Sequence, residues 1–176
     1  TSKVAGLVGP ADIEAAITEK TKLVCVTHAS NVFGTIIPVA QIGALCRDKG
    51  ILFMVDAAQT VGALPFSPEA LNIDIMAGTG HKALFGLQGT GCLYIREGIE
   101  PPALIDGGTG EVDDAIAIPD RFEAGTINMP GIGGLGAGVE FLLETGLDKI
   151  RAHEVELIGA LIDGIKDIEG IKIIGP

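Results

Sequence analysis

The sequence of 176 residues is poor in cysteine and in basic residues. Its three cysteines, Cys25, Cys46 and Cys92, are too few and too scattered for a disulfide framework, which favours a cytoplasmic location. Twelve basic residues stand against 23 acidic ones, and the formal charge of −11 argues against binding to nucleic acid or an anionic membrane. No apolar run of about 18 residues predicts a transmembrane helix, and the first residues show no signal-peptide pattern.

What is present indicates one compact α/β domain. Hydrophobic residues make up 47% of the chain and charged residues 20%, as in globular proteins, and 26 glycines suit tight connections. Continuous apolar runs predict parallel strands covered on both faces. Because the connection 86–91 allows only a hairpin, we expect the fourth strand to run antiparallel to the third. The predicted strands are 22–27, 51–55, 74–78, 92–95 and 171–174, and the predicted helices are 10–17, 38–49, 131–143 and 147–168.

Polar side chains follow two of these strands. Asp56 ends the second strand and Gln59 lies three residues on, while Thr79, His81 and Lys82 follow the third strand. Such residues are expected to meet at the carboxyl edge of a parallel sheet, where α/β proteins build their sites. Taken singly, each has a plainer interpretation: a turn cap for Asp56, a surface amide for Gln59, a structural histidine and a solvated lysine.

The ordered segments 55–59, 78–82 and 120–128 together resemble the pyridoxal-phosphate (PLP) core of class V aminotransferases, and within them the cysteine desulfurase and selenocysteine lyase branch. The resemblance implies fold type I, with a mostly parallel sheet flanked by helices, and a homodimer. It also implies that residues 1–145 form the C-terminal part of a PLP-binding large domain and that 146–176 lead into a small domain. Members of this family are considerably longer, so we expect an internal part of a protein.

The chemistry of PLP needs a lysine, an anion opposite the ring nitrogen, and donors for the phosphate and the ring hydroxyl. By the resemblance, Lys82 forms the Schiff base and moves the substrate α-proton. We expect partial burial beside His81 and the cofactor to lower the pKa of Lys82. Asp56 would keep the ring nitrogen protonated, and Gln59 would donate a hydrogen bond to the ring hydroxyl oxygen. Thr79 and His81 would bind the phosphate.

The resemblance extends to residues outside these two segments. Asn31 matches a family asparagine that reaches the substrate carboxylate and the ring hydroxyl. Thr126 resembles a threonine that crosses the dimer interface to the phosphate of the partner subunit, and the loop 107–110 could help to cover that site. His28 is interpreted as structural, and Arg121 with Glu123 as an ion pair or capping set.

The implied reaction converts L-cysteine to L-alanine and passes sulfur to an acceptor, which could be a protein. In this family the sulfur-accepting cysteine and the substrate-binding arginine belong to the trailing domain, so we expect little turnover from this chain alone. Cys25, Cys46 and Cys92 lie in apolar segments and are interpreted as buried. A class V aminotransferase or a kynureninase-like lyase remains an alternative, as does a non-catalytic chain that self-associates. No metal-ligand spacing is present.

Overall fold

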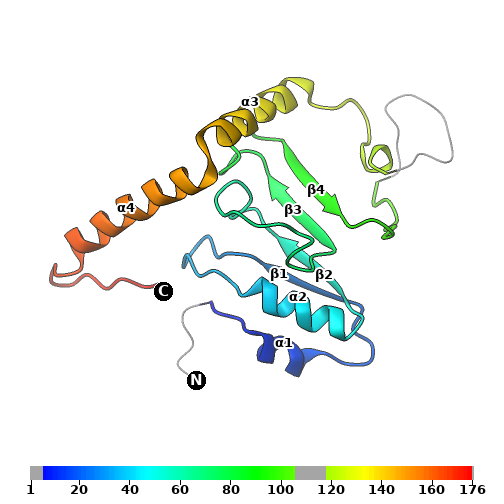
Figure 1. Cartoon of the computed structure of the whole chain (residues 1–176), viewed down its shortest axis with the longest axis horizontal. Helices are drawn as coiled ribbons and strands as arrows, with labels where there is room; N and C mark the ends of the chain where they lie inside the picture. Colours follow the sequence, from blue (N-terminus) through cyan, green and yellow to red (C-terminus); the bar gives the residue numbers. More distant parts are fainter. Residues whose placement is uncertain (1–5, 106–117, 176) are drawn as a thin grey trace.

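The computed structural model describes residues 6–105 and 118–175. A four-stranded sheet lies at its centre, with the strand order β1-β2-β3-β4 (Figure 1). Strands β1, β2 and β3 are parallel, and β4 pairs antiparallel with β3, as the short connection before it predicted. The strands are β1 (Leu23–Thr27), β2 (Leu52–Asp56), β3 (Ile75–Thr79) and β4 (Gly91–Ile95). The helices are α1 (Pro10–Ala16), α2 (Val39–Asp48), the 3₁₀ turn η1 (Asp120–Phe122), α3 (Met129–Thr145) and α4 (Leu147–Ile165).

The helix α2 covers one face of the sheet, and α1 lies beside α2 (Figure 1). Apolar side chains of α2 pack on alternate residues of β1, β2 and β3, as expected when successive strand residues point to opposite faces. Gly50, just beyond the end of α2, has a φ of +65°, which glycine adopts without strain. The buried core residues include Val24, Val39, Ile42, Cys46, Phe53, Val55 and Met76.

The other face of the sheet is open along β1 and β4. Leu23 is 45% exposed and Leu93 is 52% exposed, and Cys25 on the same face is exposed too. The prediction that the strands are covered on both faces is therefore wrong for this chain. A continuous apolar run shows that a strand can be buried on both faces, but it does not supply the element that covers the second face.

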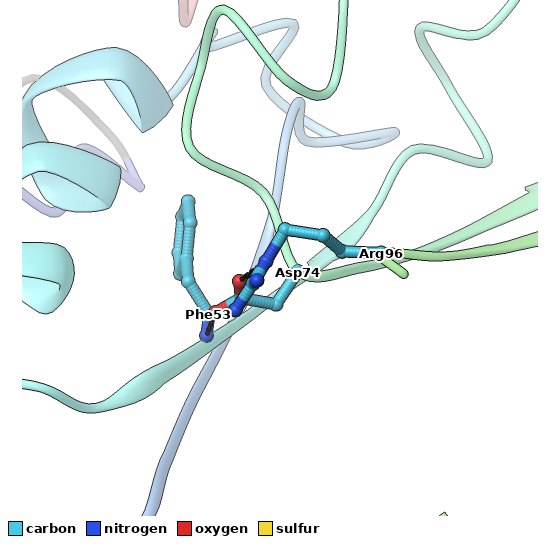
Figure 2. A network of polar contacts seen from close by, with 3 residues as sticks. All are labelled: Phe53, Asp74 and Arg96. Carbon is cyan, nitrogen blue, oxygen red and sulfur yellow. Dashed lines mark hydrogen bonds and ion pairs between the residues drawn. The ribbon is translucent and has the colours of Figure 1, made fainter. Parts of the chain in front are cut away.

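A buried carboxylate ties three strands together at the amino edge of the sheet (Figure 2). Asp74, 7% exposed, precedes β3, and its Oδ2 accepts the Phe53 N–H of β2 at 2.8 Å. Its Oδ1 accepts the Nε–H of Arg96, just beyond β4, at 2.6 Å. Since both carboxylate oxygens have charge-assisted partners, this otherwise costly buried charge is compensated.

The helices α3 and α4 follow one another with Gly146 between them, and α4 runs away from the sheet (Figure 1). The helix α4 has no buried residue. The predicted strand at 171–174 is wrong, because these residues form no strand. A strand needs a hydrogen-bonded neighbour, and the described sheet ends at β1 and β4 without reaching this segment. Among the described residues, no helix combines the length and the apolar character needed to cross a membrane.

Candidate functional site

The carboxyl ends of β1, β2 and β3 form one edge of the sheet, and most of the predicted site residues lie there. Asp56 is the last residue of β2 and pairs in register with Ala77 of β3. Thr79 ends β3 two residues further on, so the side chains of Asp56 and Thr79 point to the same face. The pairing of Thr27 with Asp56 assigns this face to the open side of the sheet, the side of Cys25 and Leu93. Strand spacing separates their Cα atoms by about 8 Å.

Asp56 is exposed, and its Oδ1 accepts the backbone N–H of Ala58 at 2.9 Å. The turn that follows is closed by hydrogen bonds from the N–H groups of Thr60 and Val61 to the carbonyl of Ala57. Among the described residues, no donor reaches the other carboxylate oxygen of Asp56. The turn-cap interpretation of Asp56 is therefore confirmed, yet the carboxylate keeps acceptor capacity for a ligand. Gln59 lies in the same turn, half-buried.

The connection after β3 brings a hydroxyl and an imidazole together. The Oγ1 of Thr79 lies 3.0 Å from the Nδ1 of His81, a hydrogen bond that either group can donate. Lys82 follows directly and is exposed to solvent, so its expected partial burial beside His81 and the cofactor stays a prediction. Because a hydroxyl, an imidazole and an ammonium group can all donate hydrogen bonds, this segment suits an anionic group such as a phosphate.

Asn31 lies beyond the carboxyl end of β1, in an exposed loop. The loop is ordered by Ser30, whose Oγ accepts the N–H groups of Val32 at 3.2 Å and Phe33 at 3.1 Å. This arrangement places Asn31 at the same edge of the sheet as Asp56, one strand away. Within the described part of the chain, the Asn31 side chain forms no hydrogen bond with the other predicted site residues.

His28 has a structural role, as the sequence predicted. It is 5% exposed, its Nδ1 lies 2.9 Å from the Thr60 Oγ1, and its ring meets the Phe66 ring edge-on at 4.9 Å. Burial disfavours the charged imidazolium and lowers the pKa of His28 below its ordinary value. The His28 side chain thus connects the end of β1 to the turn that follows Asp56 and helps to hold this turn in place.

Thr126 is exposed in the segment between η1 and α3. Its predicted contact with a partner subunit stays a prediction, and the predicted covering loop 107–110 lies outside the described residues. Arg121 does not form the expected ion pair with Glu123 within the described part of the chain. Instead it donates a hydrogen bond to the Pro101 carbonyl at 3.1 Å and its guanidinium lies 5.4 Å from the centre of the Phe122 ring.

The cysteines divide differently from the prediction. Cys46 is fully buried in α2, as expected, but Cys25 and Cys92 are exposed. Cys25 lies on the open face of the sheet, whereas the strand register places Cys92 on the opposite face, in the edge strand β4. Burial, together with the negative charge of Asp74, raises the pKa of the Cys46 thiol, so Cys46 is unsuited to act as a nucleophile.

Sequence reasoning missed Phe85, three residues after Lys82. Its φ is +56°, in the left-handed region that favours glycine. No sequence signal could have revealed it, because glycine and asparagine are the residues that indicate this conformation. Within residues 6–105 and 118–175, no cluster of three or more histidine, cysteine or acidic side chains could hold a metal ion.

Comparisons with known proteins agree with the fold. A probable cysteine desulfurase of Methanothermobacter thermautotrophicus is 37% identical over 97% of this chain, which spans 44% of that protein. The apo structure of a cysteine desulfurase from Thermococcus onnurineus NA1 matches 100% of this chain and 46% of its own, with a TM-score of 0.85 and 35% identity. A structure described as SspA in complex with cysteine matches 78% of this chain and 38% of its own, with a TM-score of 0.69 and 34% identity.

The chain thus spans less than half the length of these relatives. A family model described as aminotransferase class-V matches residues 1–176, the whole sequence. This match includes the Asp56 and Lys82 segments that carried the resemblance, and the mostly parallel sheet is the predicted fold class. The chain belongs to the class-V aminotransferase family.

Proposed function

We propose that this chain forms the cofactor-binding part of a PLP-dependent cysteine desulfurase, which converts L-cysteine to L-alanine and transfers sulfur to an acceptor. The observation that carries the proposal is the placement of Asp56 and Thr79 on one face of the carboxyl edge, with His81 and Lys82 directly after Thr79. The names of the relatives support the reaction, and the relative solved with cysteine supports cysteine as the substrate.

The donors and acceptors at this edge fit PLP. PLP supplies an aldehyde and a ring that accepts electrons from the substrate α-carbon. Lys82 Nζ would bond to the aldehyde carbon until the amino group of the substrate displaces it, and the released Lys82 amine would then take and return the α-proton. The free acceptor capacity of Asp56 would hold a proton on the ring nitrogen, and Gln59 would donate to the ring hydroxyl oxygen. Thr79 and His81 would donate to the phosphate, and Asn31 to the substrate carboxylate.

The remaining parts of the proposal concern the whole protein. Residues 1–145 would be the C-terminal part of its PLP-binding domain, and residues 146–176 would lead towards a small domain. Thr126, exposed before α3, would reach the phosphate of the partner subunit in a homodimer. The sulfur acceptor could be another protein, and the location would be the cytoplasm.

The direct test is chemical labelling of the purified chain. PLP is added in excess, the visible absorption is recorded, borohydride is added, and the modified peptide is mapped. We expect a reduced adduct on Lys82 that is lost in K82A and retained in K22A, a matched variant at the opposite edge of the sheet. We also expect Asp56→Asn to weaken PLP binding. Labelling spread evenly over the surface lysines would refute the assignment.

Self-association is the second candidate, favoured by an exposed apolar row on α4. Val155, Ile158 and Leu161 are each about half exposed, at 49%, 50% and 55%. They recur at helical spacing, so they line one side of the helix. Sedimentation of the chain, compared with an I158E/L161E variant, tests this. A concentration-dependent mass that the variant abolishes is expected, and a monomer at all concentrations would exclude it.

A further inference from the structure

The left-handed backbone conformation of Phe85 indicates that packing around this residue positions Lys82. A left-handed conformation is unfavourable for a residue with a side chain by a factor on the order of tenfold. Asn72, the other such residue that is not glycine in the described chain, belongs to a type that tolerates this conformation, but phenylalanine does not. Something in the surrounding structure must therefore hold Phe85 in place.

Two backbone hydrogen bonds join this conformation to the lysine. The Phe85 N–H donates to the carbonyl of Lys82 at 3.0 Å, and the Gly86 N–H donates to the carbonyl of Gly80 at 2.8 Å. These bonds close a short loop around Lys82. If Phe85 relaxed to an ordinary conformation, the direction of the chain at Gly86 would change and the bond from the Gly86 N–H to the Gly80 carbonyl would be lost. The orientation of the Lys82 backbone is thus coupled to the φ angle of Phe85.

The helix α3 supplies the opposing support. The ring of Phe141 meets the ring of Phe85 edge-on, with 5.6 Å between centroids and 81° between planes. One turn earlier, Gly138 lets the backbone of α3 approach the loop. A Cβ at Gly138 would lie 2.3 Å from the carbonyl oxygen of Leu84 and 3.0 Å from the carbonyl carbon of Phe85. Gly136 on the same helix has nothing within 4 Å of a Cβ, so it does not face the loop as Gly138 does.

We propose that α3 acts as a clamp on the loop of residues 80–86: Phe141 and Gly138 of α3 keep Phe85 in its left-handed conformation. This conformation in turn holds Lys82 in the orientation that reacts with the aldehyde. The inference rests on the proposed function of Lys82. Phe141, Gly138 and Phe85 are positioning residues, because none of them needs to touch the cofactor. The bond that forms joins the Lys82 nitrogen to the aldehyde carbon, and the aldehyde oxygen leaves as water.

The test uses the complete chain and two independent measurements. Hydrogen exchange of the Gly86 amide is measured without PLP, and the rate constant of adduct formation at Lys82 is measured by borohydride trapping. F141A removes the ring contact and keeps the strain, so we expect exchange to rise and the rate constant to fall, each about tenfold. F85G/F141A removes the strain as well, and we expect it to recover most of both losses, since glycine adopts this conformation freely.

The controls separate a clamp from general destabilisation. G136A on the same helix is expected to change neither measurement, whereas G138A is expected to change both in the same direction as F141A. The urea midpoint of F141A should stay near that of the wild type, because the Phe141 side chain is half exposed. Unchanged exchange in F141A, or no recovery in F85G/F141A, would overturn the clamp. Absence of any Lys82 adduct in the wild type would instead overturn the proposed function.

Discussion

Replacing Asp74 by alanine should destabilise this chain more than any loss of a surface ion pair. Two interactions disappear together: the bond from the Phe53 N–H at 2.8 Å and the bond from the Arg96 Nε–H at 2.6 Å (Figure 2). The Phe53 N–H lies in a buried strand, and leaving it without an acceptor costs about 1–3 kcal/mol. The Arg96 side chain is 43% exposed and can return to water, so its share is about 0.5–1 kcal/mol. We therefore expect D74A to lower the free energy of unfolding by about 1.5–4 kcal/mol.

Two further variants, D74N and D163A, show whether the expected loss of stability in D74A comes from burial and paired acceptors. Asparagine keeps an oxygen for the Phe53 N–H and loses the charge, so D74N should cost about 1 kcal/mol. Asp163 pairs with Lys166 at 2.8 Å on the exposed surface of α4, and its loss should cost less than about 0.5 kcal/mol. Urea unfolding followed by circular dichroism measures all three. If D74A cost no more than D163A, the reasoning from burial and paired acceptors would be refuted.

Two further predictions concern stability. Because burial lowers the pKa of His28, the unfolded chain takes up a proton before the folded one, so stability should fall as the pH drops below about 6.5. The urea midpoint should decrease from pH 7.5 to pH 5.5, and it should decrease less in H28Q. An equal decrease of the midpoint in the wild type and in H28Q would contradict this. A Cβ at Gly43 would lie 2.1 Å from the Leu71 carbonyl oxygen, so G43A should cost about 1–3 kcal/mol. G159A, with open space around it, should be neutral or stabilising by up to about 1 kcal/mol; similar losses in both would argue against the close contact.

Much of the fold could be predicted because the signals were local. The apolar runs ending in Thr27, Asp56 and Thr79 indicated parallel strands, and the short connection before Gly91 indicated an antiparallel fourth strand. The predictions that were wrong concerned long-range packing. Whether Cys25 is covered depends on elements elsewhere in the chain, and whether residues 171–174 form a strand depends on a free sheet edge beside them. Neither property is contained in the segment itself.

In the candidate site, too, local features could be predicted and long-range packing could not. The order of Asp56, Gln59 and Lys82 along the chain, together with the rule that parallel strands end at one edge, was enough to predict that these residues follow strands at that edge. The register was not predictable, yet the register decides that Asp56 and Thr79 share a face. The left-handed Phe85 was not predictable either, because the residues that contact its loop, Phe141 and Gly138, lie more than fifty residues later in the chain.

The two interpretations of Asp56 are compatible, and their combination explains how its carboxylate is held. The bond from the Ala58 N–H fixes one oxygen against the turn, and a carboxylate that serves as a turn cap loses much of its rotational freedom. A ligand that needs a proton held at a defined point then meets a group that is already oriented, and little further ordering is needed on binding. The cap therefore acts in favour of the cofactor role, because the same bond that stabilises the turn orients the remaining oxygen at the edge of the open face.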